Sequence, residues 1–197
     1  RCLSKAVSAE VKVCLSGDGG DEHFGGYPRY RAAQLYEKYW RHVPGPVRRL
    51  TAKLSGLGDH REIHRFLAGA SSGAEHAFVS WNNRCPISEC DARMVTRPYR
   101  DAGLADAMMG FDRDVTLPGN QLAMSDQCGM AFGLEYRLPL LGHDVVRLAT
   151  SVPASQHLRQ GPKTLWRQAI APYLPAGHAQ NRKIGFNPPV ADWLLGG

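Results

Sequence analysis

The sequence predicts an α/β protein in which one short strand is followed mainly by helices. Ala9–Leu15 (AEVKVCL) is short, partly β-branched and followed by a glycine-rich loop, which is typical of a buried parallel strand. After this loop, apolar residues recur mostly at helical spacing. No later segment gives an equally strong strand signal, so we expect the back portion of a parallel-sheet domain whose earlier strands precede these residues.

The residues after the loop predict a series of helices. In Tyr27–Arg41, aromatic and apolar side chains recur at helical spacing until the segment VPGP at 43–46 stops the pattern. Further helices are predicted at Val47–Leu54, Arg61–Leu67, Gly119–Phe132, His143–Ser151, Lys163–Ala171 and Pro189–Leu194. Ala70–Gly110 carries the least pattern and is interpreted as a variable insertion. No repeat or low-complexity tract divides the sequence, so residues 1–197 are treated as one partial domain.

The composition excludes several classes of protein. With 43% hydrophobic and 21% charged residues, the chain has the proportions of a globular protein rather than of a disordered, collagenous or disulfide-rich one. No apolar run approaches the roughly 18–20 residues that cross a bilayer, and the first residues lack the pattern of a signal peptide. We therefore expect a cytoplasmic protein with no membrane partner and, since it begins with Arg1, a fragment.

The positive charge of the sequence does not indicate a nucleic-acid partner. The net charge is +6, from 24 Lys and Arg against 18 Asp and Glu. These basic residues are dispersed, without a long run or an interleaved aromatic ladder, whereas nucleic-acid-binding segments concentrate them. The 5 cysteines are irregularly spaced, as expected of reduced side chains rather than of a zinc site.

The segment Ser16–Tyr27 (SGDGGDEHFGGY) is the most informative part of the sequence, because carboxylates alternate with glycines directly after the predicted strand. Ligands of open α/β sheets bind at this end of a strand, and glycine permits close approach of a backbone to a ligand. The segment is not a phosphate-binding Walker A loop, since Gly20-x4-Gly25 is followed by Gly rather than Lys. Its carboxylates indicate Mg²⁺ bound together with substrate phosphates; the alternative is a solvated acidic turn.

Three segments carry the most distinctive patterns. The first is Val11–Tyr30 (VKVCLSGDGGDEHFGGYPRY); the second, Asp112–Pro139, contains Leu-Pro, then an aspartate, then Glu-x-Arg-x-Pro. The third, Gly161–Trp193, contains Gly-x-Lys, Leu-Pro and Arg-Lys-x-Gly-Phe. In this order they resemble the synthetase domain of the asparagine synthetases that use glutamine, and the chain is identified as a member of that family. Residues 50–107 carry little of the resemblance.

The resemblance implies a fold and a reaction. The fold is that of the ATP pyrophosphatases, a parallel-sheet domain of the adenine nucleotide alpha hydrolase type. In the reaction, ATP adenylates the side-chain carboxylate of aspartate, pyrophosphate leaves, and ammonia attacks the acyl-adenylate. ATP and Mg²⁺ are the implied cofactors, and an upstream glutaminase domain is the implied source of ammonia. Because members of the family are often dimers, a homodimer is implied as well.

The resemblance also implies roles for residues of the loop. The expected nucleotide-binding residues are Ser16, Gly17, Gly19, Gly20 and Asp21. Asp21 matches the family aspartate that holds Mg²⁺ and pyrophosphate, with Glu22 beside it as a second metal ligand. Asp18 occupies the position that is Glu in many asparagine synthetases and belongs to the amide-forming step, where a carboxylate orients or deprotonates the nitrogen nucleophile.

Two further catalytic residues are implied outside the loop. Lys183, in Arg-Lys-x-Gly-Phe, matches the family lysine near the acyl phosphate, where a compact charge suits a developing pentacoordinate phosphate. Glu135 and Arg137 are expected to form a buried pair that either holds the architecture or touches substrate. Both readings of Glu135 stay open.

Departures from the family pattern keep other functions open. Gln127 stands where a basic residue is usual and Gly142 where an aspartate is frequent, and no Ser-Gly-Gly-x-Asp-Ser loop occurs in these residues. One alternative is therefore a related synthetase or amidotransferase acting on another carboxylate, although relatives that form β-lactams have Tyr where this chain has Asp18. The other is a non-catalytic fragment, since we expect these residues to be inactive alone.

Overall fold

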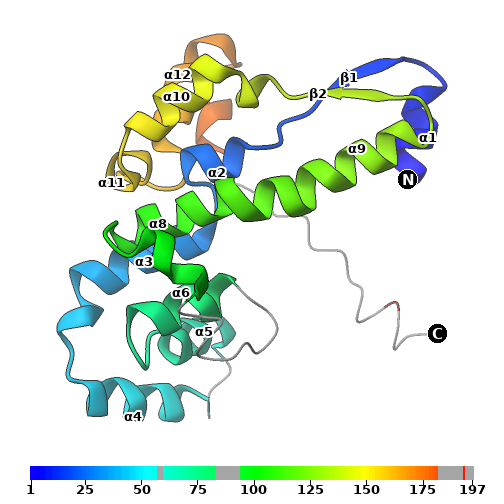
Figure 1. Ribbon diagram of the computed structural model, residues 1–197. Helices are drawn as coiled ribbons and strands as arrows, with labels where there is room; N and C mark the ends of the chain where they lie inside the picture. Colours follow the sequence, from blue (N-terminus) through cyan, green and yellow to red (C-terminus); the bar gives the residue numbers. More distant parts are fainter. Residues whose placement is uncertain (57–59, 83–93, 182–192, 194–197) are drawn as a thin grey trace. The chain divides into compact units, whose positions relative to one another are not determined.

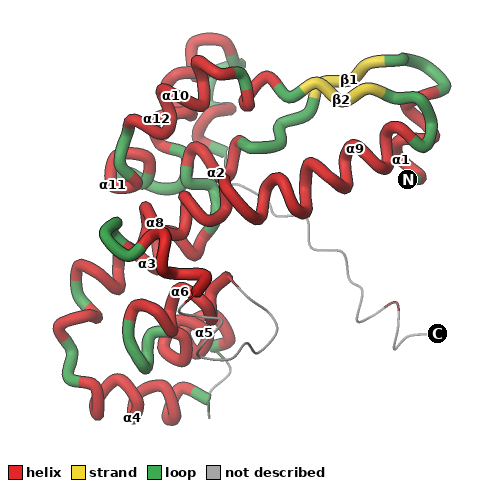
Figure 2. The backbone as a smooth tube through the Cα atoms, in the orientation of Figure 1, coloured by secondary structure: helices red, strands yellow, loops and turns green. Residues whose placement is uncertain are grey.

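The computed structural model describes residues 1–56, 60–82, 94–181 and 193. It divides the chain into two compact units, Arg1–Leu165 and Trp166–Gly197. The described residues are mostly helical and include one small sheet with two parallel strands (Figure 2). The expectation of an α/β chain that is predominantly helical after its first strand is therefore confirmed at this coarse level.

The sheet consists of β1 (Val13–Leu15) and β2 (Glu135–Arg137), with Val13 opposite Glu135 and Leu15 opposite Arg137. The predicted strand was too long, because the backbone N–H groups at positions 10 and 11 both donate to the Val7 carbonyl and so complete the end of α1 (Cys2–Ser8). The strand is also exposed rather than buried, with Leu15 74% exposed. Among the described residues only β2 pairs with it, and the side of the strand that carries Leu15 remains exposed.

The helices follow the predicted pattern with shifted ends (Figure 1). The longer ones are α3 (Pro28–Lys38), α4 (Gly45–Ser55), α5 (Arg61–Gly69), α6 (Ala74–Asn82), α8 (Leu104–Phe111), α9 (Ala123–Met130), α10 (His143–Ser151) and α12 (Thr164–Ile170). The supposed insertion Ala70–Gly110 contributes α6 and most of α8, so it is part of the packed structure. The helix predicted at Pro189–Leu194 lies outside the described residues except for Trp193.

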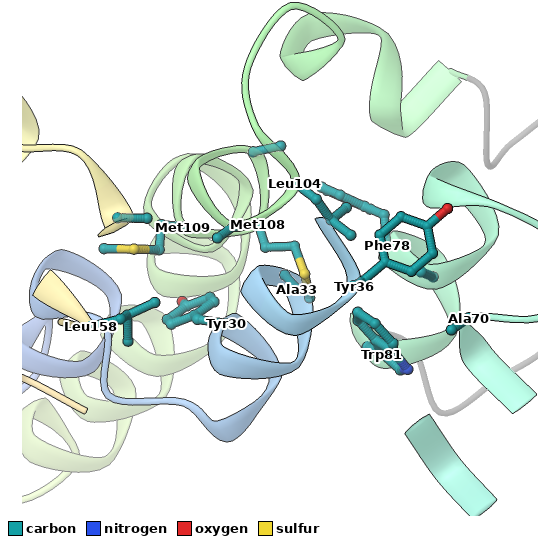
Figure 3. Close-up of a cluster of buried hydrophobic side chains, with 14 residues drawn as sticks. Tyr30, Ala33, Tyr36, Ala70, Phe78, Trp81, Leu104, Met108, Met109 and Leu158 are labelled. Carbon is teal, nitrogen blue, oxygen red and sulfur yellow. The ribbon is translucent and has the colours of Figure 1, made fainter. Parts of the chain in front are cut away.

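The hydrophobic core of the first unit forms where α3, α6 and α8 meet (Figure 3). α3 contributes Tyr30, Ala33 and Tyr36 at helical spacing, and α8 contributes Met108, which is 0% exposed. Trp81 of α6 lies within the same cluster. Burying each large apolar side chain stabilises the fold by about 1.5–3 kcal/mol, so this cluster is what holds α3 in place beside the glycine-rich loop.

α8 continues without a break into a π-helix, Asp112–Leu122, and then into α9. Asp112 and Leu117, five residues apart, are both buried, at 1% and 3% exposed. In a uniform α-helix a step of five residues turns a side chain about 140° away from the starting face, whereas the wider π turn keeps both on one side. Pro118, which lacks the N–H that an α-helical turn uses, lies inside this segment.

α4 presents its apolar residues to solvent and its polar residues to the protein. Val47, Leu50 and Leu54 follow one helical face and are 46%, 57% and 57% exposed. On the inner side Arg48 donates a hydrogen bond to the Tyr36 hydroxyl at 3.1 Å. α4 packs against α5, and the apolar side chains of its outer face remain exposed.

The second unit begins within α12. Arg167 Nη1 donates to the carbonyl oxygens of Ala179 and Asn181, at 3.2 and 3.0 Å. Short 3₁₀ turns lie at Ala171–Tyr173 and His178–Gln180. In the described part of the chain, no helix combines the length and the hydropathy required to span a bilayer.

Candidate functional site

The glycine-rich loop joins β1 to the short helix α2 (Gly20–Phe24). Ser16 N–H donates to the Arg137 carbonyl at 2.9 Å, which extends the strand pairing by one residue, and Gly20 N–H closes a turn onto the Gly17 carbonyl at 3.2 Å. Gly19 has a φ angle of 84°, which residues other than glycine rarely adopt. The turn therefore directs residues 20–22 away from the strand and into α2.

Asp21 and Lys163 form an ion pair at the start of α2, with 2.8 Å between Oδ1 and Nζ. Their side chains are 25% and 23% exposed, so both groups remain accessible from solvent. Lys163 has φ of 59°, the one non-glycine residue with positive φ in the described ranges. Such backbone costs about 1–3 kcal/mol and is concentrated at functional sites. Lys163 was not among the predicted site residues, although the pattern Gly161-x-Lys163 is a signal for it.

Asp18 is held by a helix that is distant in sequence. Ser125 Oγ of α9 donates to Asp18 Oδ2 at 3.1 Å. Within the loop, the Asp18 N–H lies 3.4 Å from Ser16 Oγ, which is longer than an ordinary hydrogen bond. The structure thus brings Asp18 to α9, and the sequence contained no motif that predicted Ser125 as its partner.

Glu22 is 1% exposed and accepts a hydrogen bond from the Tyr27 hydroxyl at 2.5 Å. Gln121 Nε2 in turn donates to that hydroxyl at 2.7 Å. Burial, together with the bond to Glu22, raises the pKa of Tyr27 well above its ordinary value. Glu22 therefore lies in a buried hydrogen-bonded chain, whereas Asp21 is accessible.

Comparison with known proteins decides the family. The sequence profile of the family described as asparagine synthase matches residues 1–197, the whole chain. This chain belongs to the asparagine synthase family. In Mycobacterium tuberculosis (strain H37Rv) a protein named putative asparagine synthetase (glutamine-hydrolyzing) is 32% identical over 215 residues, covering 99% of this chain. In Bacillus subtilis (strain 168) asparagine synthetase (glutamine-hydrolyzing) 1 is 26% identical over 214 residues, covering 98% of it.

The chain spans about a third of the length of these curated relatives, 32% of the mycobacterial protein and 33% of the Bacillus one. No solved structure matches the chain significantly. The family assignment confirms the resemblance on which the site residues were predicted, while the individual roles of those residues stay predictions.

Glu135, a predicted catalytic residue of this asparagine synthase family chain, lies on β2 beside Arg137 rather than in the loop. Arg137 Nε donates to Glu135 Oε1 at 3.0 Å, but the two side chains are 65% and 57% exposed. The prediction of a buried pair is therefore wrong, because Glu135 and Arg137 alternate along β2 and share its exposed face. Lys183, the other predicted catalytic residue outside the loop, lies outside the described residues.

The residues of this family member fit a magnesium ion bound chiefly through phosphates. No group of three or more His, Cys, Asp or Glu residues in the described ranges is placed to hold a metal by itself. Mg²⁺ needs only one or two carboxylates when substrate phosphates and water complete its coordination. Asp21 has an accessible carboxylate, and the cationic Lys163 Nζ lies beside it. Glu22 instead accepts a hydrogen bond from the Tyr27 hydroxyl.

Proposed function

We propose that this chain carries the amide-forming site of a glutamine-dependent asparagine synthetase. ATP adenylates the side-chain carboxylate of aspartate and releases pyrophosphate; ammonia then attacks the acyl-adenylate to give asparagine and AMP. The observation that carries the proposal is the accessible Asp21–Lys163 pair at the end of a parallel strand, beside Asp18. Its position also supports an ATP-pyrophosphatase fold, because ligands of open α/β sheets bind where parallel strands end.

The pair suits the first step, in which negative charge moves onto the leaving pyrophosphate. Lys163 Nζ places a compact positive charge where that leaving group develops charge, and such prearranged charge stabilises the transition state. Asp21 would hold Mg²⁺, which when bound neutralises phosphate charge. We assign the loop residues Ser16, Gly17, Gly19 and Gly20 to nucleotide binding. The N–H groups of Ser16 and Gly20 donate to the Arg137 and Gly17 carbonyls, so backbone contacts to the phosphates would come from Gly17 and Gly19.

The second step needs a group that accepts a proton from the attacking nitrogen. Asp18 is half-buried in the same loop, and its carboxylate is oriented by Ser125. We assign Asp18 to that role and Lys183 to the acyl phosphate. For Glu135 two roles stay open, architectural support or contact with substrate.

The names of the relatives support glutamine as the source of nitrogen. Both are named glutamine-hydrolyzing, so we propose that ammonia reaches the site from a glutaminase domain of the same protein. A homodimer, a cytoplasmic location with access to ATP, and the absence of nucleic-acid or membrane partners complete the proposal.

A different carboxylate substrate is the second candidate. Gln127 replaces a basic residue that is usual in the family, and Gly142 replaces an aspartate. Loss of that positive charge favours a carboxylate substrate with less negative charge than aspartate. A screen of carboxylic acids that follows ATP-dependent pyrophosphate release separates the two candidates.

The test compares Asp21→Asn and Lys163→Met with wild type in the complete polypeptide. Each variant should lose on the order of 10²-fold or more in the rate of aspartate-dependent pyrophosphate release, as expected when charge stabilisation of the transition state is removed. Asp144→Asn is the matched control, because this carboxylate also pairs with a cation, Arg147, but is 91% exposed on α10. Near-normal rates in Asp21→Asn and Lys163→Met would contradict the site assignment.

A further inference from the structure

We propose that the face of the helix formed by the π segment and α9 positions the acidic loop for catalysis, with Ser125 as the positioning residue for Asp18. The inference rests on the proposed function, because it assigns Ser125 to the amide-forming step. Ser125 is separated from Asp18 by 107 residues and stands at no motif position that the sequence analysis singled out. Its assignment depends on the fold alone.

The loop itself holds Asp18 weakly. The bond from the Asp18 N–H to Ser16 Oγ is long, at 3.4 Å. A Cβ built at the neighbouring Gly17 would meet nothing within 4 Å, so packing does not fix this part of the loop either. The 3.1 Å bond from Ser125 Oγ occupies Asp18 Oδ2 and thereby orients the carboxylate. Hydrogen bonds to charged groups are among the stronger ones in proteins.

A second contact from the same helix acts on the other end of the loop. Gln121 lies one helical turn before Ser125, and its amide donates to Tyr27, which donates to Glu22. Residues four apart share a helical face. One rigid helix thus contacts the loop at Asp18 and, through Tyr27, at Glu22, on either side of Asp21.

The π segment sets the direction of this face. Asp112 and Leu117 are buried and five residues apart, and the half-buried Gln121 and Ser125 follow at steps of four. The step of five would rotate the later residues about 140° off the face if the helix were α-helical throughout. π-helical turns are frequently found at functional sites, and here the turn aligns the anchored Asp112 with Ser125.

In the amide-forming step the ammonia nitrogen forms a bond to the acyl carbon, and the bond from that carbon to the AMP oxygen breaks. One proton leaves the nitrogen, and Asp18 accepts it. A misplacement of about 1 Å can lower the rate of such a step by about 10²-fold. Ser125 therefore affects the attack of ammonia, whereas adenylation depends on Asp21 and Lys163.

The test uses Ser125→Ala and Ser125→Thr in the complete polypeptide, with Met124→Ala as control, since Met124 is the preceding residue of α9 and is 59% exposed. ATP–pyrophosphate exchange reports adenylation, and asparagine formation at varied ammonia reports the second step. We expect Ser125→Ala to lower kcat/KM for ammonia about 10-fold or more with exchange within about twofold of wild type. Ser125→Thr, which keeps the hydroxyl, should restore most of the loss.

The outcomes separate this inference from the proposed function. If wild type shows no aspartate-dependent exchange, the proposed function fails. If wild type is active and Ser125→Ala forms asparagine normally, only the positioning role is overturned. An equal loss of exchange and asparagine formation, without rescue by Ser125→Thr, would also overturn it, because that pattern indicates a general structural defect.

A thermal measurement tests the contact without reference to activity. Ser125→Ala and Asp18→Asn should lower the melting temperature by less in combination than the sum of the single effects, with a coupling of about 2–4 °C for each kcal/mol of interaction. Additive effects would show that the two side chains do not interact, and would overturn the inference.

Discussion

Gly26→Ala tests the site without removing any functional group. Gly26 lies against the ion pair: a Cβ built there would overlap Asp21 Oδ1 and would lie 2.6 Å from both Asp21 Cγ and Lys163 Cε. Ordinary contacts of a Cβ are 3.4–4 Å, so Asp21 Oδ1 must move by about 1.5–2 Å and Lys163 Cε by about 1 Å. The φ angle of Gly26 is not positive, so the added methyl group, rather than backbone strain, causes the change.

The displacement predicts the size of two effects, one on the reaction rate and one on stability. A shift of about 1 Å in catalytic groups lowers the rate by about 10²-fold. Both contacts of the added methyl group are with the ends of flexible, partly exposed side chains, which can shift at little cost, so the free energy of unfolding should fall by about 1 kcal/mol or less and the melting temperature by about 2–4 °C at most. Gly26→Ala should therefore fold and remain soluble at ordinary temperature while losing most of its pyrophosphate release.

The assay measures aspartate-dependent pyrophosphate release and thermal unfolding of the same preparation. Gly45→Ala, at the start of α4, is the matched control, because a Cβ there would make only ordinary contacts, 3.7 Å from Arg49 Nη1 and 4.0 Å from Arg48 Nη2. It should keep wild-type activity and gain a little stability from the higher helix propensity of alanine. Wild-type activity in a folded Gly26→Ala protein would refute the reasoning, since the site would then tolerate displacement of the pair.

Two further predictions concern stability. Asp112→Asn removes the buried carboxylate that accepts hydrogen bonds from Arg29 and from the Tyr30 hydroxyl. Because breaking a buried pair costs about 3–5 kcal/mol, the melting temperature should fall by about 6–20 °C. A smaller loss than in Asp114→Asn, at an exposed neighbouring carboxylate, would contradict this. Burial lowers the pKa of His23 and His157 below 6.5, so the unfolded chain binds more protons below that pH. Stability should be complete above about pH 7 and fall towards about pH 5.5, and replacing both histidines with glutamine should flatten the dependence; an unchanged slope in melting temperature would show that other groups cause it.

The local patterns of the sequence predicted much of the fold. His143–Ser151 was predicted with its observed ends, because the apolar spacing is regular and Pro153 follows. The glycine-rich loop was also correctly placed after a strand. The start of that strand was predicted too early, since Ala9–Val11 complete the end of α1. A short apolar segment does not indicate whether its first residues belong to the strand or to the preceding helix.

The contacts that assemble the site could not be predicted from local patterns. Lys163 meets Asp21 only because the chain returns to α2 after α10 and α11 (Ala154–His157), and Ser125 reaches Asp18 only through the rotation that the π-helix adds. The pairing of Glu135 with Arg137 follows from alternation along a strand, but its exposure depends on the layers around the sheet. Pair contacts between distant segments are properties of the packed structure, whereas motifs report single segments.

The reversed orientation of α4 affects how the protein behaves in the laboratory. Val47, Leu50 and Leu54 form an aliphatic ridge on the outside of this helix, which lies well apart from α2 in Figure 1. Exposed apolar side chains grouped in this way promote adhesion to a resin, a vessel wall or another copy in concentrated solution. Glutamine at positions 50 and 54 would make the surface wettable while leaving residues 16–26 untouched, and so offers a route to samples suited to crystallisation.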